Sequence, residues 1–147
     1  VFEAAADRKQ GREPLWDCVE AKRYMSGLPF VDEAKIAIIG GSFGGYMTLA
    51  ALAFHPDEFA AGVAISGVSN WIRALKSLSP GSHASKLYQE KVGNADTDEE
   101  MLRSISPLFH AEKISKPLMV IHGAKDPRVS RVESDDIVAA VRRVVGR

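Results

Sequence analysis

One stretch of the chain, residues 35–55, constrains the fold more than any other. It starts with a short run rich in β-branched residues, Lys35 to Gly40, continues through the glycine-rich turn GGSFG, and ends in a second apolar run, Phe43 to His55. A short apolar run closed by glycine is typical of a buried strand in a parallel sheet, and a longer run that is apolar almost all round predicts an enclosed helix. We therefore expect a strand, a sharp turn and a buried helix in immediate succession.

The rest of the chain repeats this alternation of helices and short apolar strands. The remaining expected elements are a helix at 14–25, a strand at 61–65, short helices at 84–92 and 97–105, a strand at 117–122 and a helix from 130. Capping-box spacing marks the last two helices, in the pairs Thr97/Glu100 and Ser130/Glu133. Strands joined by helical crossovers form a parallel sheet with flanking helices, so the expected fold class is α/β.

Composition excludes several kinds of function. At 147 residues, with 46% hydrophobic and 26% charged residues, the chain has the size and balance of one globular domain. Nineteen basic residues cancel nineteen acidic ones, so charge points to neither nucleic acid nor an anionic membrane surface. No apolar run approaches the roughly 20 residues that cross a bilayer.

The cysteine and histidine content is equally restrictive. Cys18 is the one cysteine, which excludes an internal disulfide and fits a reducing compartment, so a cytoplasmic location is weakly favoured. The four histidines, at 55, 83, 110 and 122, lack the helical pair spacing of zinc enzymes. We expect no metal site and no cofactor.

The turn at residues 40–44 matches the GxSxG motif, between a predicted strand and a predicted helix. In such an elbow the serine, here Ser42, lies on a strained turn that lifts its hydroxyl clear of the sheet as a nucleophile. The next backbone amide, that of Phe43, and the helix N-terminus favour a developing oxyanion. The alternative is a phosphate-binding turn with an incidental serine, but the stretch lacks GxGxxG and no Lys-Ser/Thr pair follows.

A serine nucleophile needs a histidine base and a carboxylate that orients the base. Asp126 follows the strand expected at 117–122 through a short loop, which is where this chain order places the acid, although an ordinary turn aspartate remains the alternative. Asp135 and Asp136 are poorer candidates, since they fall inside the last helix. His122 is the histidine nearest in sequence, yet at a strand end before glycine we expect it to shape the acid loop instead.

These residues resemble the catalytic domain of the prolyl oligopeptidase family of serine peptidases, which has the α/β-hydrolase fold. The resemblance covers nearly the whole chain. It is carried by the motifs GGSFGGYM at 40–47, FAAGV at 59–63, GVSNW at 67–71, Ser106-Pro107, and His122-Gly123 through Asp126 to Val129.

The resemblance implies roles for five residues. Ser42 would be the nucleophile, Asp126 the acid and Phe43 the backbone oxyanion donor. Tyr46 and Trp71 would contribute to substrate binding, with a simple core position as the open alternative for Trp71.

The resemblance also implies that 1–147 is a partial domain. The upstream strands are absent, and the family histidine belongs to a loop that would follow the last helix. We expect a peptidase of acylaminoacyl, dipeptidyl or oligopeptidase type, acting on a peptide or acyl-ester substrate. The alternatives are a carboxylesterase on the same chemistry and a non-catalytic fragment that self-associates through an exposed sheet edge.

Overall fold

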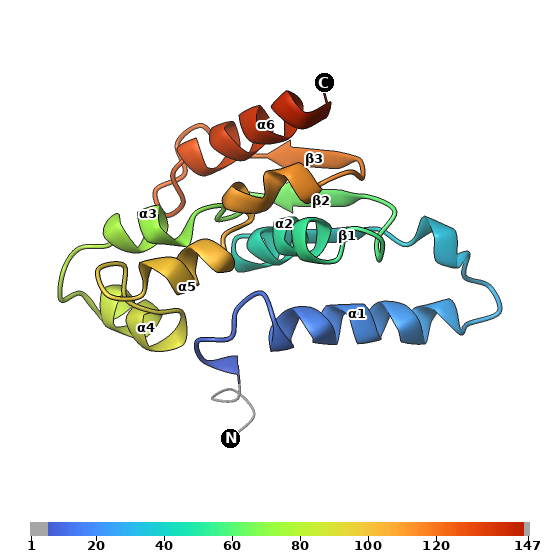
Figure 1. Ribbon diagram of the computed structural model, residues 1–147, viewed down its shortest axis with the longest axis horizontal. Coiled ribbons are helices and arrows are strands. Elements are labelled where there is room, and N and C mark those ends of the chain that lie inside the picture. Colours follow the sequence, from blue (N-terminus) through green and yellow to red (C-terminus); the bar gives the residue numbers. More distant parts are fainter. Residues whose placement is uncertain (1–5, 146–147) are drawn as a thin grey trace.

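The computed structural model describes residues 6–145, and it shows a small parallel sheet with helices packed around it (Figure 1). The elements in chain order are α1 (Glu13–Ser26), the 3-10 helix η2 (Glu33–Lys35), β1 (Ile38–Gly41), α2 (Phe43–Phe54), β2 (Gly62–Ile65), α3 (Trp71–Lys76), α4 (His83–Lys91), α5 (Glu99–Ser104), the 3-10 helix η3 (Pro107–Lys113), β3 (Leu118–Ile121) and α6 (Val132–Val145). The expected α/β class, a parallel sheet with flanking helices, is confirmed.

The three strands are parallel and lie in the order β1-β2-β3. Ile38 lies opposite Gly62, which in turn lies opposite Leu118. The hydrogen bonds between strands continue one residue beyond β1 and β2. The amide of Ser42 donates to Ile65 O at 2.8 Å, and the amide of Ser66 donates to Ile121 O at 2.8 Å. All three strands therefore end at one edge of the sheet, toward α3 (Figure 1).

Local side-chain contacts explain where the expected boundaries were wrong. The first strand begins at Ile38 rather than Lys35, because Asp32 accepts a hydrogen bond from Ala34 N at 3.1 Å and starts the short 3-10 helix η2. The helix α3 was not predicted. It is capped by Asn70, whose side chain accepts from the amides of Ile72 and Arg73.

Both expected capping boxes are wrong. Helix α5 begins after Asp98, which makes no side-chain cap and instead accepts hydrogen bonds from Asn94 N and Arg8. At the start of α6 the Glu133 side chain does not reach back to Ser130; its carboxylate contacts the segment that follows β2. At the start of both helices an acidic side chain, Asp98 or Glu133, accepts a hydrogen bond from a residue distant in the sequence instead of capping the helix.

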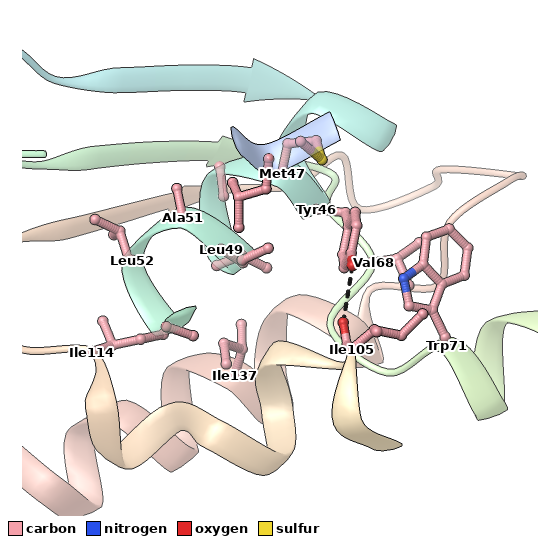
Figure 2. Close-up of a cluster of buried hydrophobic side chains, with 14 of the residues drawn as sticks. Tyr46, Met47, Leu49, Ala51, Leu52, Val68, Trp71, Ile105, Ile114 and Ile137 are labelled. Atoms are coloured by element: carbon pink, nitrogen blue, oxygen red, sulfur yellow. Dashed lines mark hydrogen bonds between the residues drawn. The ribbon is translucent and has the colours of Figure 1, made fainter. Parts of the chain in front are cut away.

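The core lies on one face of the sheet and is centred on α2. Residues 45–53 of this helix are all buried, as expected for an enclosed helix. Leu49 and Leu52 lie among side chains that include Ile114 and Ile137, and the hydroxyl of Tyr46 donates to Ile105 O at 3.0 Å (Figure 2).

The opposite face of the sheet is open within residues 6–145. Ile39 is 69% exposed, Met119 59% and Ile121 41%. Alternate residues of these strands point to opposite faces, so one face packs on α2 while the other keeps its apolar side chains exposed. The expectation that the first strand is buried on both sides is therefore wrong for the described residues.

Two glycines of the elbow, Gly40 and Gly45, allow it to close. A Cβ on Gly40 would lie 2.3 Å from the carbonyl oxygen of Gly44, and a Cβ on Gly45 would lie 2.8 Å from Gly67 Cα and from Ile65 O. A Cβ on Gly44 would meet nothing within 4 Å. The backbone of β1 thus contacts the first turn of α2, which in turn contacts the backbone after β2.

A matched pair of substitutions tests this close packing. We expect Gly45→Ala to lower the free energy of unfolding by about 1–3 kcal/mol, because its methyl group must displace backbone rather than a flexible side chain. Gly44→Ala, one position earlier, should leave stability unchanged or raise it by up to about 1 kcal/mol, since alanine favours a helix. Urea unfolding of both variants checks the difference, and equal effects would contradict the packing described above.

Candidate active site

Ser42 lies at the point where β1 turns into α2. Its backbone has φ 55° and ψ −117°, a conformation that costs a non-glycine residue about 1–3 kcal/mol. The surrounding ladder holds it there, because Ser42 N donates to Ile65 O and Ser42 O accepts from Tyr46 N at 3.0 Å. The residue is exposed, so the strained turn presents its hydroxyl to solvent.

The amide of Phe43 is placed beside this hydroxyl. Phe43 is the first residue of α2, and the first N–H groups of a helix have no acceptor within the helix. The positive end of the helix dipole lies at the same point. The arrangement is that of a backbone donor for negative charge that develops next to Ser42.

Asp126 lies in the loop of residues 122–131, between β3 and α6. Its Oδ1 accepts hydrogen bonds from the amides of Arg128 at 2.9 Å and Val129 at 3.0 Å. The Val129 and Arg128 amides lower the pKa of the Asp126 carboxyl to about 2, with smaller contributions from the Ser66 hydroxyl and the nearby His122. Asp126 is therefore a carboxylate at neutral pH, as an orienting acid must be.

Ser66 was missed in the sequence. It follows β2 with a positive φ of 48°, and its hydroxyl contributes to lowering the pKa of the Asp126 carboxyl. The sequence did contain a signal for this position. The carboxyl ends of parallel strands lie side by side, and one residue directly follows each of the three strands: Ser42, Ser66 and His122.

Ser42 directly follows β1, whereas Asp126 lies in the loop after β3. β2 lies between β1 and β3, so the ends of the outer strands are two strand spacings, about 10 Å, apart. A triad with Ser42 as nucleophile and Asp126 as acid would need a histidine base between the two side chains.

Three of the four histidines are excluded as this base. His122 has both ring nitrogens in contact, Nδ1 with Ser134 Oγ at 2.7 Å and Nε2 with Val129 O at 2.9 Å. His55 follows the last residue of α2, and a helix of 12 residues puts it about 18 Å from Ser42. His110 packs against Phe54 at that same far end, with ring centroids 5.3 Å apart. The fourth, His83, is the exposed first residue of α4.

Tyr46 and Trp71 lie in the core rather than on an open surface. Tyr46 is 0% exposed and Trp71 2%, and their rings make an edge contact with centroids 5.0 Å apart (Figure 2). Phe43 is 39% exposed and covers both rings, at 5.6 and 6.3 Å. In this arrangement a substrate reaches neither buried ring, so their role in binding stays a prediction that the burial does not favour.

Glu133 is a buried carboxylate that ties α6 to the segment after β2. It is 2% exposed, and its Oε2 accepts from Ser69 N, Ser69 Oγ and Asn70 N at 2.7–2.9 Å. Its Oε1 accepts from Arg73 Nε at 2.7 Å, while Arg73 Nη1 also pairs with Asp136 at 2.6 Å. This network fixes the start of α3 relative to the acid loop. Within residues 6–145, no group of three acidic, histidine or cysteine side chains is placed to hold a metal ion.

Removing the buried carboxylate should be costly. We expect Glu133→Ala to lower the free energy of unfolding by about 3 kcal/mol, because two buried amides, a hydroxyl and a guanidinium lose their acceptor together. Asp136→Ala, which removes the exposed partner of Arg73, should cost less than about 1 kcal/mol. Thermal or urea unfolding measures both, and a Glu133→Ala chain as stable as Asp136→Ala would show that the network contributes little.

Fold and site together define a serine hydrolase of the α/β-hydrolase class. A family model described as the prolyl oligopeptidase family matches residues 1–145, so the chain belongs to that family of serine peptidases.

Individual relatives agree with this assignment. The chain is 40% identical over 143 residues to dipeptidyl peptidase family member 6 of Caenorhabditis elegans, a match that covers 95% of this chain and 19% of that protein. It is 42% identical over 130 residues to dipeptidyl aminopeptidase BIII of Pseudoxanthomonas mexicana, covering 86% of this chain and 19% of that protein. The acylaminoacyl peptidase of Pyrococcus horikoshii superposes with a TM-score of 0.85 at 28% identity, over 98% of this chain and 23% of its own.

The chain thus spans about a fifth of the length of these curated relatives. Among residues 6–145 there is no helix with the length and apolar character needed to span a membrane.

Proposed function

We propose that the protein carrying this chain is a serine peptidase that hydrolyses peptide bonds through an acyl-enzyme on Ser42. Ser42 Oγ attacks the scissile carbonyl carbon while its proton passes to a histidine base, and the amine leaves with that proton. Water then hydrolyses the ester and frees the serine. The Phe43 amide stabilises the oxyanion, Asp126 orients the base, and the base is a histidine other than His55, His110 and His122.

One observation carries this proposal. Ser42 is held in a strained, exposed turn at the same sheet edge where two backbone amides keep Asp126 ionised. A turn with a purely structural role would need neither the strained backbone of Ser42 nor an ionised carboxylate in the loop after β3.

The substrate class follows the relatives rather than the geometry. The matched proteins are named as dipeptidyl peptidases and an acylaminoacyl peptidase, which favours short peptides or blocked amino termini as substrates. A carboxylesterase would use the same nucleophile and acid, and only the leaving group differs. Comparing a dipeptide anilide with the ester of the same acyl group separates the two, since a true esterase hydrolyses the ester alone.

Covalent labelling tests the nucleophile directly. In the longest natural polypeptide that contains residues 1–147, a fluorophosphonate should label one serine, and Ser42→Ala should abolish the label. Asp126→Asn should slow labelling by roughly 10²–10⁴-fold, because the histidine loses its orienting partner. Ser104→Ala, an exposed serine on α5, is the matched control and should label like the wild type. Undiminished labelling of Ser42→Ala would contradict the assignment.

A second candidate, self-association, is favoured by the open sheet. Within residues 6–145 both β1 and β3 pair only with β2, so each has an unpaired edge, and Ile39 and Met119 are exposed on one face. Unpaired edges favour pairing with a second copy of the chain.

Sedimentation velocity tests the self-association of residues 1–147. We expect the mean mass to rise with concentration, and Ile39→Lys to reduce that rise because a charge on the open face opposes burial. Glu20→Lys, on the exposed side of α1, is the control for added charge and should behave like the wild type. A monomer across the whole concentration range would refute this candidate.

A further inference from the structure

His122 is a buried side chain that the proposed reaction does not use. It directly follows β3, and its side chain is only 4% exposed. Its Nε2 lies 2.9 Å from the carbonyl oxygen of Val129 and its Nδ1 lies 2.7 Å from Ser134 Oγ. One ring thus joins the end of β3 to the far end of the acid loop and to α6.

The partners fix the tautomer. A carbonyl oxygen only accepts hydrogen bonds, so Nε2 carries a proton and donates to Val129. In the neutral ring Nδ1 is then the acceptor, and it takes the proton of the Ser134 hydroxyl. Neither nitrogen has a lone pair left for the Ser42 proton, which separates the role of His122 from that of a base.

Val129 links this ring to the acid. Its carbonyl accepts from His122, and its amide donates to Asp126 Oδ1 at 3.0 Å. The amides of Val129 and Arg128 are the principal cause of the low pKa of Asp126. His122 Nε2 itself is 4.0 Å from Asp126 Oδ2, beyond a hydrogen bond. The ring therefore acts on the carboxylate through the backbone of Val129.

We propose that His122 is a positioning residue, whose Nε2–H holds Val129 so that the loop amides keep the Asp126 carboxylate fixed. The role of Asp126 in catalysis rests on the function proposed above. The hydrogen bond from His122 to Val129 is a property of the loop and does not depend on that function.

Replacing His122 by glutamine or by asparagine separates the two hydrogen bonds of the ring, because each variant can keep only one of them. In His122→Gln the side-chain NH₂ stands near the place of Nε2, so it can still donate to Val129. In His122→Asn the amide ends near the place of Nδ1, so it reaches Ser134 but not Val129. Both variants remove the imidazole, so any direct effect of its charge on Asp126 is lost equally in the two.

The readout is the pKa of Asp126, followed by carboxyl ¹³C NMR in the 147-residue chain during acid titration. We expect the pKa to rise slightly in His122→Gln, because the charge of the ring is lost, and to rise by about 1 unit more in His122→Asn, because the amide donors of Asp126 are no longer held in place as well. An equal rise in both variants would assign the effect to the charge of the His122 ring. No rise in either would show that the contact with Val129 does not affect Asp126. Each result overturns the proposal.

The wild-type chain provides a test that does not depend on the variants folding. ¹⁵N NMR of the neutral His122 ring should show a protonated Nε2 and an unprotonated Nδ1. The opposite tautomer would overturn the proposal, since Nε2 could not donate to Val129. Neither measurement requires hydrolysis. If the 147-residue chain passes both but Ser42 of the longest natural polypeptide is not labelled, the proposed function alone is contradicted.

Discussion

The site depends on the contact of backbone with backbone at the elbow. β1 and α2 approach so closely that a single Cβ on Gly40 would overlap the carbonyl of Gly44, and Gly45 meets Gly67 in the same way on the other side of the turn. This contact accompanies the strained backbone of Ser42 and brings the first turn of α2 against the backbone after β2. The burial of nine consecutive residues of α2 supplies the stability that offsets the strain.

Asp126 is held by a different set of contacts, on the other side of β2. Loop amides and the Ser66 hydroxyl surround Asp126, while His122 and Glu133 join the ends of its loop to β3, α3 and α6. Ser42 and Asp126 are thus positioned by separate sets of contacts that share only the sheet.

Much of the fold was predictable because its signals are local. The strand, turn and helix around Ser42 follow from a short β-branched run, glycines at fixed offsets and a longer apolar run, and all three elements form in the expected order, although the strand begins later than expected. Boundaries failed where a side chain found another partner: Asp32 started a 3-10 helix before β1, and Asn70 capped a helix that the sequence did not reveal. Glu133 had the spacing of a capping box, yet it turned inward to amides more than sixty residues away.

The sequence by itself determined the elbow, the α/β class and the position of Asp126 after a strand, because each depends on residues adjacent in the chain. Only the tertiary structure decided which acceptors the buried donors would find. It placed Ser66 against Asp126, gave His122 two partners, and buried Tyr46 and Trp71 beneath Phe43 instead of opening them to substrate. Buried polar groups must be paired wherever the fold brings a partner within reach, and sequence spacing does not encode that distance.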